Sequence, residues 1–237
     1  MRAQSSLLRR HLSSCAERIP SYFYQTWKTD SLLPFQESNR ARWLFELRQI
    51  DPVAYQPGSE ASKLWVDADF DSFVSENFAW FLPTWQKLTP FIKKVDTIRY
   101  MWLYKTGGIY CDLDLSLEQP RVIREYLTRP FPKCTAIVTS NSSFHRLAHS
   151  SPVIMMSHAG HDLWIHMLKY IERHAEEENV LACTGPDALS SCVREYSRDP
   201  SRRGNLKFIS QSRFGITPKL YCGRMVTNHS NSGLWCT

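Results

Sequence analysis

Apolar and polar positions along the chain follow two periods, which predict strands and helices in turn. Residues 109–116 alternate at period two, as a strand does. Residues 91–105 repeat apolar side chains every three or four positions, as a helix does. We expect further strands over 19–26, 63–66, 135–139, 152–157 and after 206. We expect further helices over 34–50, 69–88 in two pieces broken at Pro83, 121–127, 161–177 and 185–197.

This order of elements favours an α/β fold in which helices cover one sheet. The chain has 237 residues, of which 43% are hydrophobic and 22% charged, and this is ordinary for a soluble globular protein. The prolines are spread out, and no repeat appears. We therefore expect one domain over 19–237, preceded by a basic, flexible arm over 1–18. No apolar run approaches the roughly 20 residues that span a bilayer, so no membrane anchor is expected.

The net charge of +6 comes from 29 Lys and Arg against 23 Asp and Glu. Residues 1–18 supply half of this excess, because they hold four arginines and one acid. The rest is too small and scattered for a nucleic-acid-binding surface, although it suits an enzyme that holds a diphosphate. The arm is rich in Arg and Ser, as mitochondrial transit peptides are, and the sequence leaves open whether it is a targeting segment or a flexible terminus.

The seven cysteines are an odd number without a CxxC pair or a Cys/His cluster at zinc spacing. A complete disulfide framework is impossible, and we expect buried free thiols in a reducing compartment. Sequons begin at Asn141 and Asn228, but they matter only in a secreted chain. These features predict a soluble protein, in the cytoplasm rather than the Golgi lumen.

The most informative stretch is GGIYCDLDLS, at 107–116. Residues two apart in a strand share a face, so Asp112 and Asp114 would lie on one side and Cys111 and Leu113 on the other. Two like charges so placed repel each other, and a cation between them would stabilise the arrangement. Carboxylate oxygens suit Mg²⁺ or Mn²⁺, which usually take one or two protein carboxylates together with water and substrate phosphate. The alternative is a half-exposed strand whose solvent face carries two acids.

The helix before this stretch carries polar residues that would meet the two carboxylates. Asp96, Arg99 and Tyr100 stand at i, i+3 and i+4, on one helical face. Gly107 and Gly108 then end the helix and bring the chain directly from that face to the strand. Acid, guanidinium and metal site would converge in one place. The alternative is an exposed Asp–Arg pair that contributes a few tenths of a kcal/mol.

The pattern D-x-x-R-Y-x-x-L-Y-x-x-G-G-I-Y-x-D-x-D over 96–114 resembles the signature of glycosyltransferase family 32, the DXD-containing sugar transferases of the yeast initiating α-1,6-mannosyltransferase type. Four further segments are similar to motifs of that family and occur in the same order: Ile19-Pro20 with Gln25-Thr26-Trp27-Lys28, Leu64-Trp65-Val66-Asp67, Thr184-Gly185-Pro186, and His229 with Trp235. Two departures exist, because Tyr24 stands where the family usually has His and the closing motif is stretched.

The resemblance implies a GT-A fold with a Rossmann-like mixed sheet, a nucleotide-sugar donor, a divalent metal and retention of anomeric configuration. Asp112 and Asp114 would hold Mn²⁺ (or Mg²⁺) against the donor's diphosphate, with His229 as a further ligand. Such an ion neutralises charge on the leaving diphosphate. Asp96 and Arg99 would hydrogen-bond the hydroxyls of the donor sugar. The resemblance associates these further residues with the nucleotide sugar: Gln25, Trp27, Asp67, Tyr100, Gly107, Gly108 and Trp235.

The donor would be GDP-mannose or a UDP-hexose, and the acceptor a glycan, a lipid or a protein. Several residues also allow a structural interpretation: Trp27 could be a core side chain, and His229 a surface histidine. Asp67 and Asp69 form a second D-x-D, in which we expect Asp67 near the nucleotide and Asp69 as a helix N-cap. Thr184 has the form of a helix cap or could line the acceptor side.

Two other function classes stay open on the sequence. Haloacid-dehalogenase-type phosphatases also carry D-x-D-x-[TV] after an apolar strand, although Ser116 replaces the last residue here. A non-catalytic sugar- or nucleotide-binding module is the second class, and it would be favoured by the loss of one acid. Both acids are present.

Overall fold

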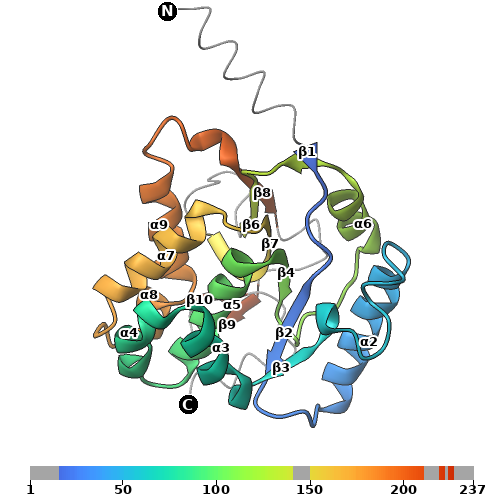
Figure 1. Cartoon of the computed structure of the whole chain (residues 1–237), viewed down its shortest axis with the longest axis horizontal. Coiled ribbons are helices and arrows are strands. Elements are labelled where there is room, and N and C mark those ends of the chain that lie inside the picture. The colour runs from blue at the N-terminus through green and yellow to red at the C-terminus, as the bar shows by residue number, and fades with distance from the viewer. Residues whose placement is uncertain (1–15, 141–149, 211–218, 222–223, 227–237) are drawn as a thin grey trace, which may run out of the picture.

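One six-stranded sheet lies between two layers of helices (Figure 1). The computed structural model describes residues 16–140, 150–210, 219–221 and 224–226. The strand order is β3-β2-β4-β7-β6-β8. Strand β7 runs antiparallel to β4 and to β6, and the other neighbours pair in parallel. The prediction of an α/β fold with a mixed sheet is therefore confirmed.

The strands of this sheet are short and rich in β-branched and aromatic side chains, which favour extended backbone. Their bounds are β2 Phe23–Trp27, β3 Leu64–Val66, β4 Gly107–Cys111, β6 Ala136–Ser140, β7 Ser150–His158 and β8 Leu206–Ser210. In the parallel pairs Trp27 lies beside Val66, and Tyr24 beside Tyr110. Strands β2, β3 and β4 therefore end at the same side of the sheet, which we call the carboxyl edge.

Helices cover both faces of the sheet (Figure 1). On the right in that view lie α2 (Pro34–Arg48) and α6 (Pro120–Thr128). On the left lie α3 Phe70–Asn77, α4 Leu82–Lys87, α5 Ile92–Lys105, α7 Asp162–Arg173, α8 Val180–Cys183 and α9 Pro186–Tyr196. Because both faces are covered, the central strands β2 and β4 are almost entirely buried.

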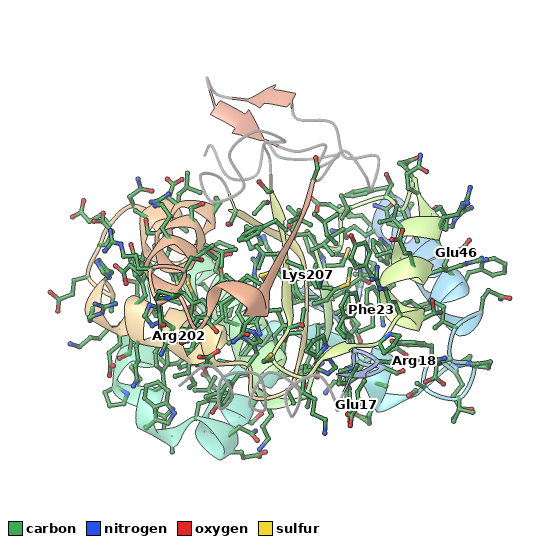
Figure 2. The ribbon with its side chains drawn as sticks, turned by 90° about the horizontal axis from the view of Figure 1, so that it is seen from above. Glu17, Arg18, Phe23, Glu46, Arg202 and Lys207 are labelled. Carbon is green, nitrogen blue, oxygen red and sulfur yellow. The ribbon has the colours of Figure 1, made fainter. Side chains whose placement is uncertain are left out.

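Each face of the sheet has its own apolar core, and alternate residues of one strand enter different cores. Phe23 packs under α2, where its ring stacks on that of Trp43 at 5.7 Å (Figure 2). The next residue, Tyr24, points to the other face and stacks on Trp102 of α5 at 5.2 Å. The period-two pattern of the sequence therefore fixes which residues face α5, where the candidate site lies.

Short elements complete the fold. They are the paired strands β1 (Ala16–Glu17) and β5 (Phe131–Pro132), the paired strands β9 (Lys219–Tyr221) and β10 (Arg224–Val226), and the 3-10 helices η1 Glu60–Ser62, η2 Asp67–Asp69, η3 Ala79–Phe81 and η4 Arg203–Asn205. The described end of the predicted basic arm thus pairs with β5, and residues 1–15 lie outside the described part.

Two predicted elements differ from the structure, and one helix of the structure was not predicted. The strand expected over 109–116 ends at Cys111, because the chain then turns and the Leu115 amide bonds back to the Asp112 carbonyl at 3.2 Å. The helix expected over 69–88 breaks at Phe78 and not at Pro83, which lies in the first turn of α4, where proline is tolerated. Helix α8 was not predicted at all.

Positions 107 and 108 require glycine because of their backbone angles and their close packing within the sheet. Both have positive φ, 69° and 106°, which L side chains rarely adopt. A Cβ on Gly107 would lie 2.6 Å from the Ser157 carbonyl, and one on Gly108 would lie 2.5 Å from that of Tyr22. The glycine pair therefore lets β4 begin between two neighbouring backbones directly after α5.

No helix in the described part of the chain is long and apolar enough to cross a bilayer. Four cysteines fall in that part, and all four carry free thiols: Cys111, Cys134, Cys183 and Cys192. Three of them are buried, and Cys134 is partly exposed. The expectation of free thiols is confirmed for these four.

Candidate functional site

Each of the three parallel strands brings a predicted site residue to the carboxyl edge. Trp27 is the last residue of β2, Asp67 comes directly after β3, and Asp112 directly after β4. Ligands of open α/β sheets bind at such edges, because backbone and side chains from neighbouring strands converge there. The sequence motifs around these three residues are therefore brought together by the parallel pairing of β2, β3 and β4.

Asp112 and Asp114 lie in the turn after β4, so the prediction that both belong to a strand face is wrong. Two contacts hold this turn besides its own backbone bond. The Asp112 amide donates to the Val153 carbonyl at 2.9 Å, and the Trp43 indole donates to the Leu115 carbonyl at 2.9 Å. Both aspartates remain partly exposed, and 20% of the Asp112 side chain is accessible. The turn thus presents two carboxylates from a fixed backbone.

The Asp112 carboxylate is oriented by two donors that both reach Oδ1. The Tyr110 hydroxyl donates at 2.6 Å, and the Arg99 guanidinium at 3.4 Å. Tyr110 was not among the predicted site residues. It stands two positions before Asp112, so strand periodicity could have indicated that both side chains leave the same face.

Arg99 connects the DXD turn to helix α5. Besides Asp112, its guanidinium donates to Asp96 Oδ1 at 2.5 Å and lies over the Tyr110 ring at 4.7 Å. Only 6% of the Arg99 side chain and 11% of the Asp96 side chain are exposed. The interpretation of these residues as an exposed surface pair is therefore wrong.

The groups around Arg99 favour the charged form of its guanidinium. Burial alone would lower the pKa of the guanidinium, but Tyr110, Asp96 and Asp112 together raise it above its ordinary value. Among the described residues, the Arg99 Nε is buried without a hydrogen-bond partner. Buried polar atoms usually have partners, so this donor is a candidate contact for a ligand.

Asp96 receives a second donor from a distant part of the chain. The Thr184 hydroxyl donates to Asp96 Oδ2 at 2.9 Å, while Arg99 occupies Oδ1. Burial raises the pKa of Asp96, and the charge of Arg99 with the two hydrogen bonds opposes that rise. Two donors on two oxygens fit the carboxylate form. The prediction that Thr184 caps the helix that starts after it is wrong, because Gly185 is the N-cap residue of α9 and Thr184 is the C-cap residue of α8.

Tyr100 lies in the core and supports the site from behind. Its side chain is fully buried, its ring stacks on Trp164 at 6.0 Å, and its hydroxyl donates to the Thr184 carbonyl at 2.9 Å. A role of Tyr100 at the nucleotide sugar stays a prediction, since it makes contacts within the protein in this structure.

The expected nucleotide-binding residues lie on β2 and just after β3. Trp27 is partly exposed and belongs to neither apolar core, so a core role does not describe it. Gln25 is buried, and its Oε1 accepts from Arg40 at 3.0 Å. Burial raises the pKa of Asp67, and the nearby charge of Lys28 opposes this rise. Contact of these residues with a nucleotide stays a prediction.

Asp69 has a structural role that differs from the predicted one. It stands at the N-cap position of α3, but its side chain does not cap that helix. Its carboxylate accepts from the Val66 amide at 3.0 Å and pairs with Lys63 at 3.2 Å. The second D-x-D is therefore no duplicate of the first, because Asp69 closes the turn around η2.

The two carboxylates after β4 fit a hard divalent cation whose remaining coordination positions are filled by water and substrate phosphate. In the part of the chain that the structure describes, no group of three or more His, Cys, Asp and Glu side chains is arranged around a common point. Asp112 and Asp114 offer two carboxylates in one turn, and Mg²⁺ or Mn²⁺ typically takes one or two of these. The predicted contributions of His229 and Trp235 lie outside the described residues.

Comparison with known proteins finds a family match for this region. Residues 5–129 match the family described as glycosyltransferase sugar-binding region containing DXD motif. Inositol phosphoceramide mannosyltransferase 1 of Schizosaccharomyces pombe is 35% identical over 104 residues, 44% of this chain and 30% of that protein. Mannosyl phosphorylinositol ceramide synthase CSH1 of Saccharomyces cerevisiae is 25% identical over 185 residues, 76% of this chain and 44% of that protein. The matches therefore span less than half of each relative.

Solved structures share the fold at low sequence identity. PaToxG glycosyltransferase superposes with a TM-score of 0.51 at 13% identity, covering 84% of this chain and 78% of its own. The UDP-bound glycosyltransferase domain of the YGT toxin has a TM-score of 0.54 at 10% identity, with 81% and 80% covered. At such identities the likeness concerns the fold, and it confirms the expected GT-A architecture.

Proposed function

Because the chain belongs to the glycosyltransferase family whose sugar-binding region contains the DXD motif, we propose that it transfers a hexose from a nucleotide-diphosphate sugar to an acceptor hydroxyl with the help of a divalent metal. One yeast relative is named a mannosyltransferase and the other a mannosyl phosphorylinositol ceramide synthase, which favours mannose as the hexose. Their names also contain inositol phosphoceramide or its mannosyl product, which favours a lipid acceptor over a glycan or protein. The YGT domain binds UDP, which supports a nucleotide-linked donor.

One observation carries this proposal. Arg99 donates both to Asp96 on its own helix and to Asp112 in the DXD turn, in a setting with little solvent. A surface ion pair needs no such burial, and burying charged groups is costly unless they are paired. The arrangement is what a site requires that must hold a sugar next to a metal-bound diphosphate.

In this proposal the carboxylates after β4 bind the metal, and the Asp96–Arg99 pair binds the sugar. A bound Mg²⁺ or Mn²⁺ supplies positive charge where negative charge develops on the leaving diphosphate. Asp112 and Asp114 would hold that ion, and Tyr110 and Arg99 keep Asp112 in one orientation. Asp96 and Arg99 would bind donor-sugar hydroxyls, since each carboxylate oxygen has a second lone pair. Charge-assisted bonds of this kind fix orientation strongly.

Trp27 and Asp67, which comes directly after β3, would hold the nucleotide base and ribose. An indole offers an apolar face for stacking and one N–H donor. Its position at the end of β2, partly exposed at the carboxyl edge, supports this assignment. Retention of anomeric configuration belongs to the same proposal.

The alternatives from the sequence have less support. The family assignment replaces the haloacid-dehalogenase interpretation of D-x-D. A non-catalytic module would not need both acids together with a buried guanidinium beside them.

Ligand binding and turnover test the proposal. GDP and UDP are compared for the increase they cause in melting temperature, with and without Mn²⁺. The purified chain is then given GDP-mannose, UDP-glucose and UDP-galactose with vesicles containing inositol phosphoceramide. We expect metal-dependent mannosyl transfer, and slow metal-dependent hydrolysis of the donor without vesicles.

Two variants sharpen this test. Asp112→Asn keeps the shape of the side chain and should abolish transfer. Asp51→Asn is the matched control, because Asp51 accepts from Ser21 ahead of β2, at the edge opposite to the site. Release of phosphate from an aryl phosphate would contradict the proposal. Turnover that is unchanged without metal and in Asp112→Asn would contradict it as well.

A further inference from the structure

We infer that Thr184 is a positioning residue for the donor sugar, acting through Asp96, and this inference rests on the proposed function. Thr184 lies 88 residues after Asp96 in the chain, at the junction of α8 and α9. Its side chain is fully buried, so it touches no acceptor directly. Its role follows from what the hydroxyl binds.

The Asp96 carboxylate is held from two sides. Thr184 donates to Oδ2 at 2.9 Å, and Arg99 donates to Oδ1. A carboxylate with one donor can still rotate about its Cβ–Cγ bond, whereas donors on both oxygens fix the plane of the group. The orientation of Asp96 in turn fixes Arg99, whose other nitrogen reaches Asp112. The Thr184 hydroxyl therefore helps to set the geometry of the Asp96–Arg99 pair, which is expected to bind the donor sugar.

The hydroxyl of Thr184 has one proton and two acceptors in reach. The Val180 carbonyl lies 3.3 Å away and the Asp96 carboxylate 2.9 Å away. The shorter contact to the charged acceptor is the stronger one. A bond to Val180 would be a local helix contact only, and the experiment below separates the two.

Each residue of the T-G-P sequence contributes to this arrangement. The Thr184 backbone is fixed because its carbonyl accepts from Tyr100 and its amide donates to Val180 at 3.0 Å. Gly185 passes close to α8, and a Cβ there would lie 3.0 Å from the Leu181 Cα. Pro186 is the first residue of α9, where its fixed φ suits a helix start. The motif therefore brings one hydroxyl to Asp96, and it does not cap the helix that follows.

The decisive variant is Thr184→Val, which keeps the shape and removes the hydroxyl. We expect kcat/KM for the nucleotide sugar to fall by about 10-fold or more, which is the effect of one hydrogen bond to a charged group. Thr184→Ser keeps the hydroxyl and should stay within about 2-fold of the parent. Affinity for the nucleotide diphosphate, which lacks the sugar, should be unchanged in both variants.

Thr97→Val is the matched control. Thr97 is also a fully buried threonine on α5, and it donates to the Lys93 carbonyl at 2.7 Å and not to a carboxylate. It should lower the melting temperature about as much as Thr184→Val does, and leave kcat/KM unchanged. A loss of activity equal to that of Thr184→Val would show that the effect is one of general stability, and would overturn the inference.

A double-mutant cycle with Asp96→Ala tests the contact itself, because alanine removes both carboxylate oxygens. If Thr184 acts through Asp96, Thr184→Val has little further effect in the Asp96→Ala background, both in kcat/KM and in melting temperature. Additive effects would overturn the inference, as would normal activity of Thr184→Val or low activity of Thr184→Ser. The melting temperatures report on the contact even if the parent chain transfers no sugar, and that result would contradict the proposed function instead.

Discussion

The guanidinium of Arg99 donates to the Asp112 carboxylate at 3.4 Å, and this contact joins helix α5 to the DXD turn. The two residues are 13 positions apart, on either side of the Gly107-Gly108 reversal. The contact links the part of the site expected to hold the sugar with the part expected to hold the metal. Arg99 is also nearly completely buried, so the fold depends on it. Substitutions at Arg99 should therefore affect folding and turnover together, and the two effects need separate measurements.

We expect Arg99→Ala to lower the free energy of unfolding by about 3–5 kcal/mol, because the carboxylates of Asp96 and Asp112 would lose their buried cation. Arg99→Lys should cost less, since it keeps the charge and loses only the planar fork. Both variants should lower kcat/KM for the nucleotide sugar by roughly 10- to 150-fold. Denaturant titration and steady-state kinetics measure the two effects.

Binding of the nucleotide diphosphate separates the two parts of the site in this experiment. Because it lacks the sugar, and because lysine keeps a positive charge beside Asp112, its affinity for Arg99→Lys should fall much less than turnover does. If nucleotide affinity falls as much as turnover does, Arg99 has been assigned to the wrong part of the site. Normal transfer by Arg99→Lys would contradict a role at the sugar altogether.

Asp114→Ala should abolish transfer while changing the free energy of unfolding by no more than about 1 kcal/mol, because Asp114 is partly exposed. Chelation with EDTA should stop the parent enzyme, and added Mn²⁺ or Mg²⁺ should restore it. Asp69→Ala is the matched control from the second D-x-D. It should lose the Lys63 pair and some stability and keep metal-dependent turnover. Metal-dependent turnover by Asp114→Ala would contradict the assignment of Asp114 as a metal ligand.

The sequence predicted the layers of the fold, because its alternating periods depend on which face of each element is buried. It also brought Asp96 and Arg99 to the DXD residues, since helical spacing and the glycine pair are local features. It placed the strand end wrongly, because a turn held by the Trp43 indole depends on a residue about 70 positions away. It misassigned Thr184 for the same reason, as nothing near position 184 indicates a bond to Asp96.

The glycine pair shows how one sequence signal can have two physical causes. Glycines near a phosphate-binding turn suggest close approach of a ligand, and the resemblance associates Gly107 and Gly108 with the nucleotide sugar. In the structure the close neighbours are the backbones of Ser157 and Tyr22. Tertiary packing of this kind has no local pattern, so the sequence indicated that glycine is needed and could not indicate why.

Tyr110→Phe should weaken metal binding without disturbing the fold. The variant keeps the ring beneath Arg99 and loses the donor to Asp112 Oδ1. Residues that orient a metal ligand typically contribute 10- to 100-fold in affinity or activity, and we expect a loss of about 10-fold. The dependence of turnover on Mn²⁺ concentration should shift to higher concentration.

Tyr24→Phe is the control for this prediction. Tyr24 lies beside Tyr110 in the parallel pairing of β2 and β4, and its hydroxyl bonds to Thr106, directly before β4. Its removal costs one partly buried hydrogen bond that does not involve the DXD turn. An equal shift in Mn²⁺ dependence for Tyr24→Phe and Tyr110→Phe would show that the effect comes from loss of sheet stability.

Protonation of His161, at the start of α7, should make the stability of the fold depend on pH. Its Nδ1 accepts from the Leu163 amide at 3.1 Å and so caps α7, while Nε2 lies 2.9 Å from the Cys134 carbonyl. An acceptor at Nδ1 and a carbonyl at Nε2 define the neutral ring with its proton on Nε2. Burial lowers the pKa of His161, and the charge of Asp162 and the carbonyls of Cys134 and Asn205 oppose this only in part.

A lowered pKa in the folded state means that the unfolded chain takes up the proton more readily. His161 therefore stabilises the fold fully above its ordinary pKa of about 6.5, and this contribution is lost as pH falls below that value. We expect the free energy of unfolding to decrease with acidity by up to about 1.4 kcal/mol per pH unit from this residue. His161→Asn keeps a capping oxygen and cannot titrate, so its stability should fall less steeply between pH 6.5 and 5. Denaturant titrations at several pH values compare the slopes, and equal slopes for parent and variant would show that His161 does not carry this dependence.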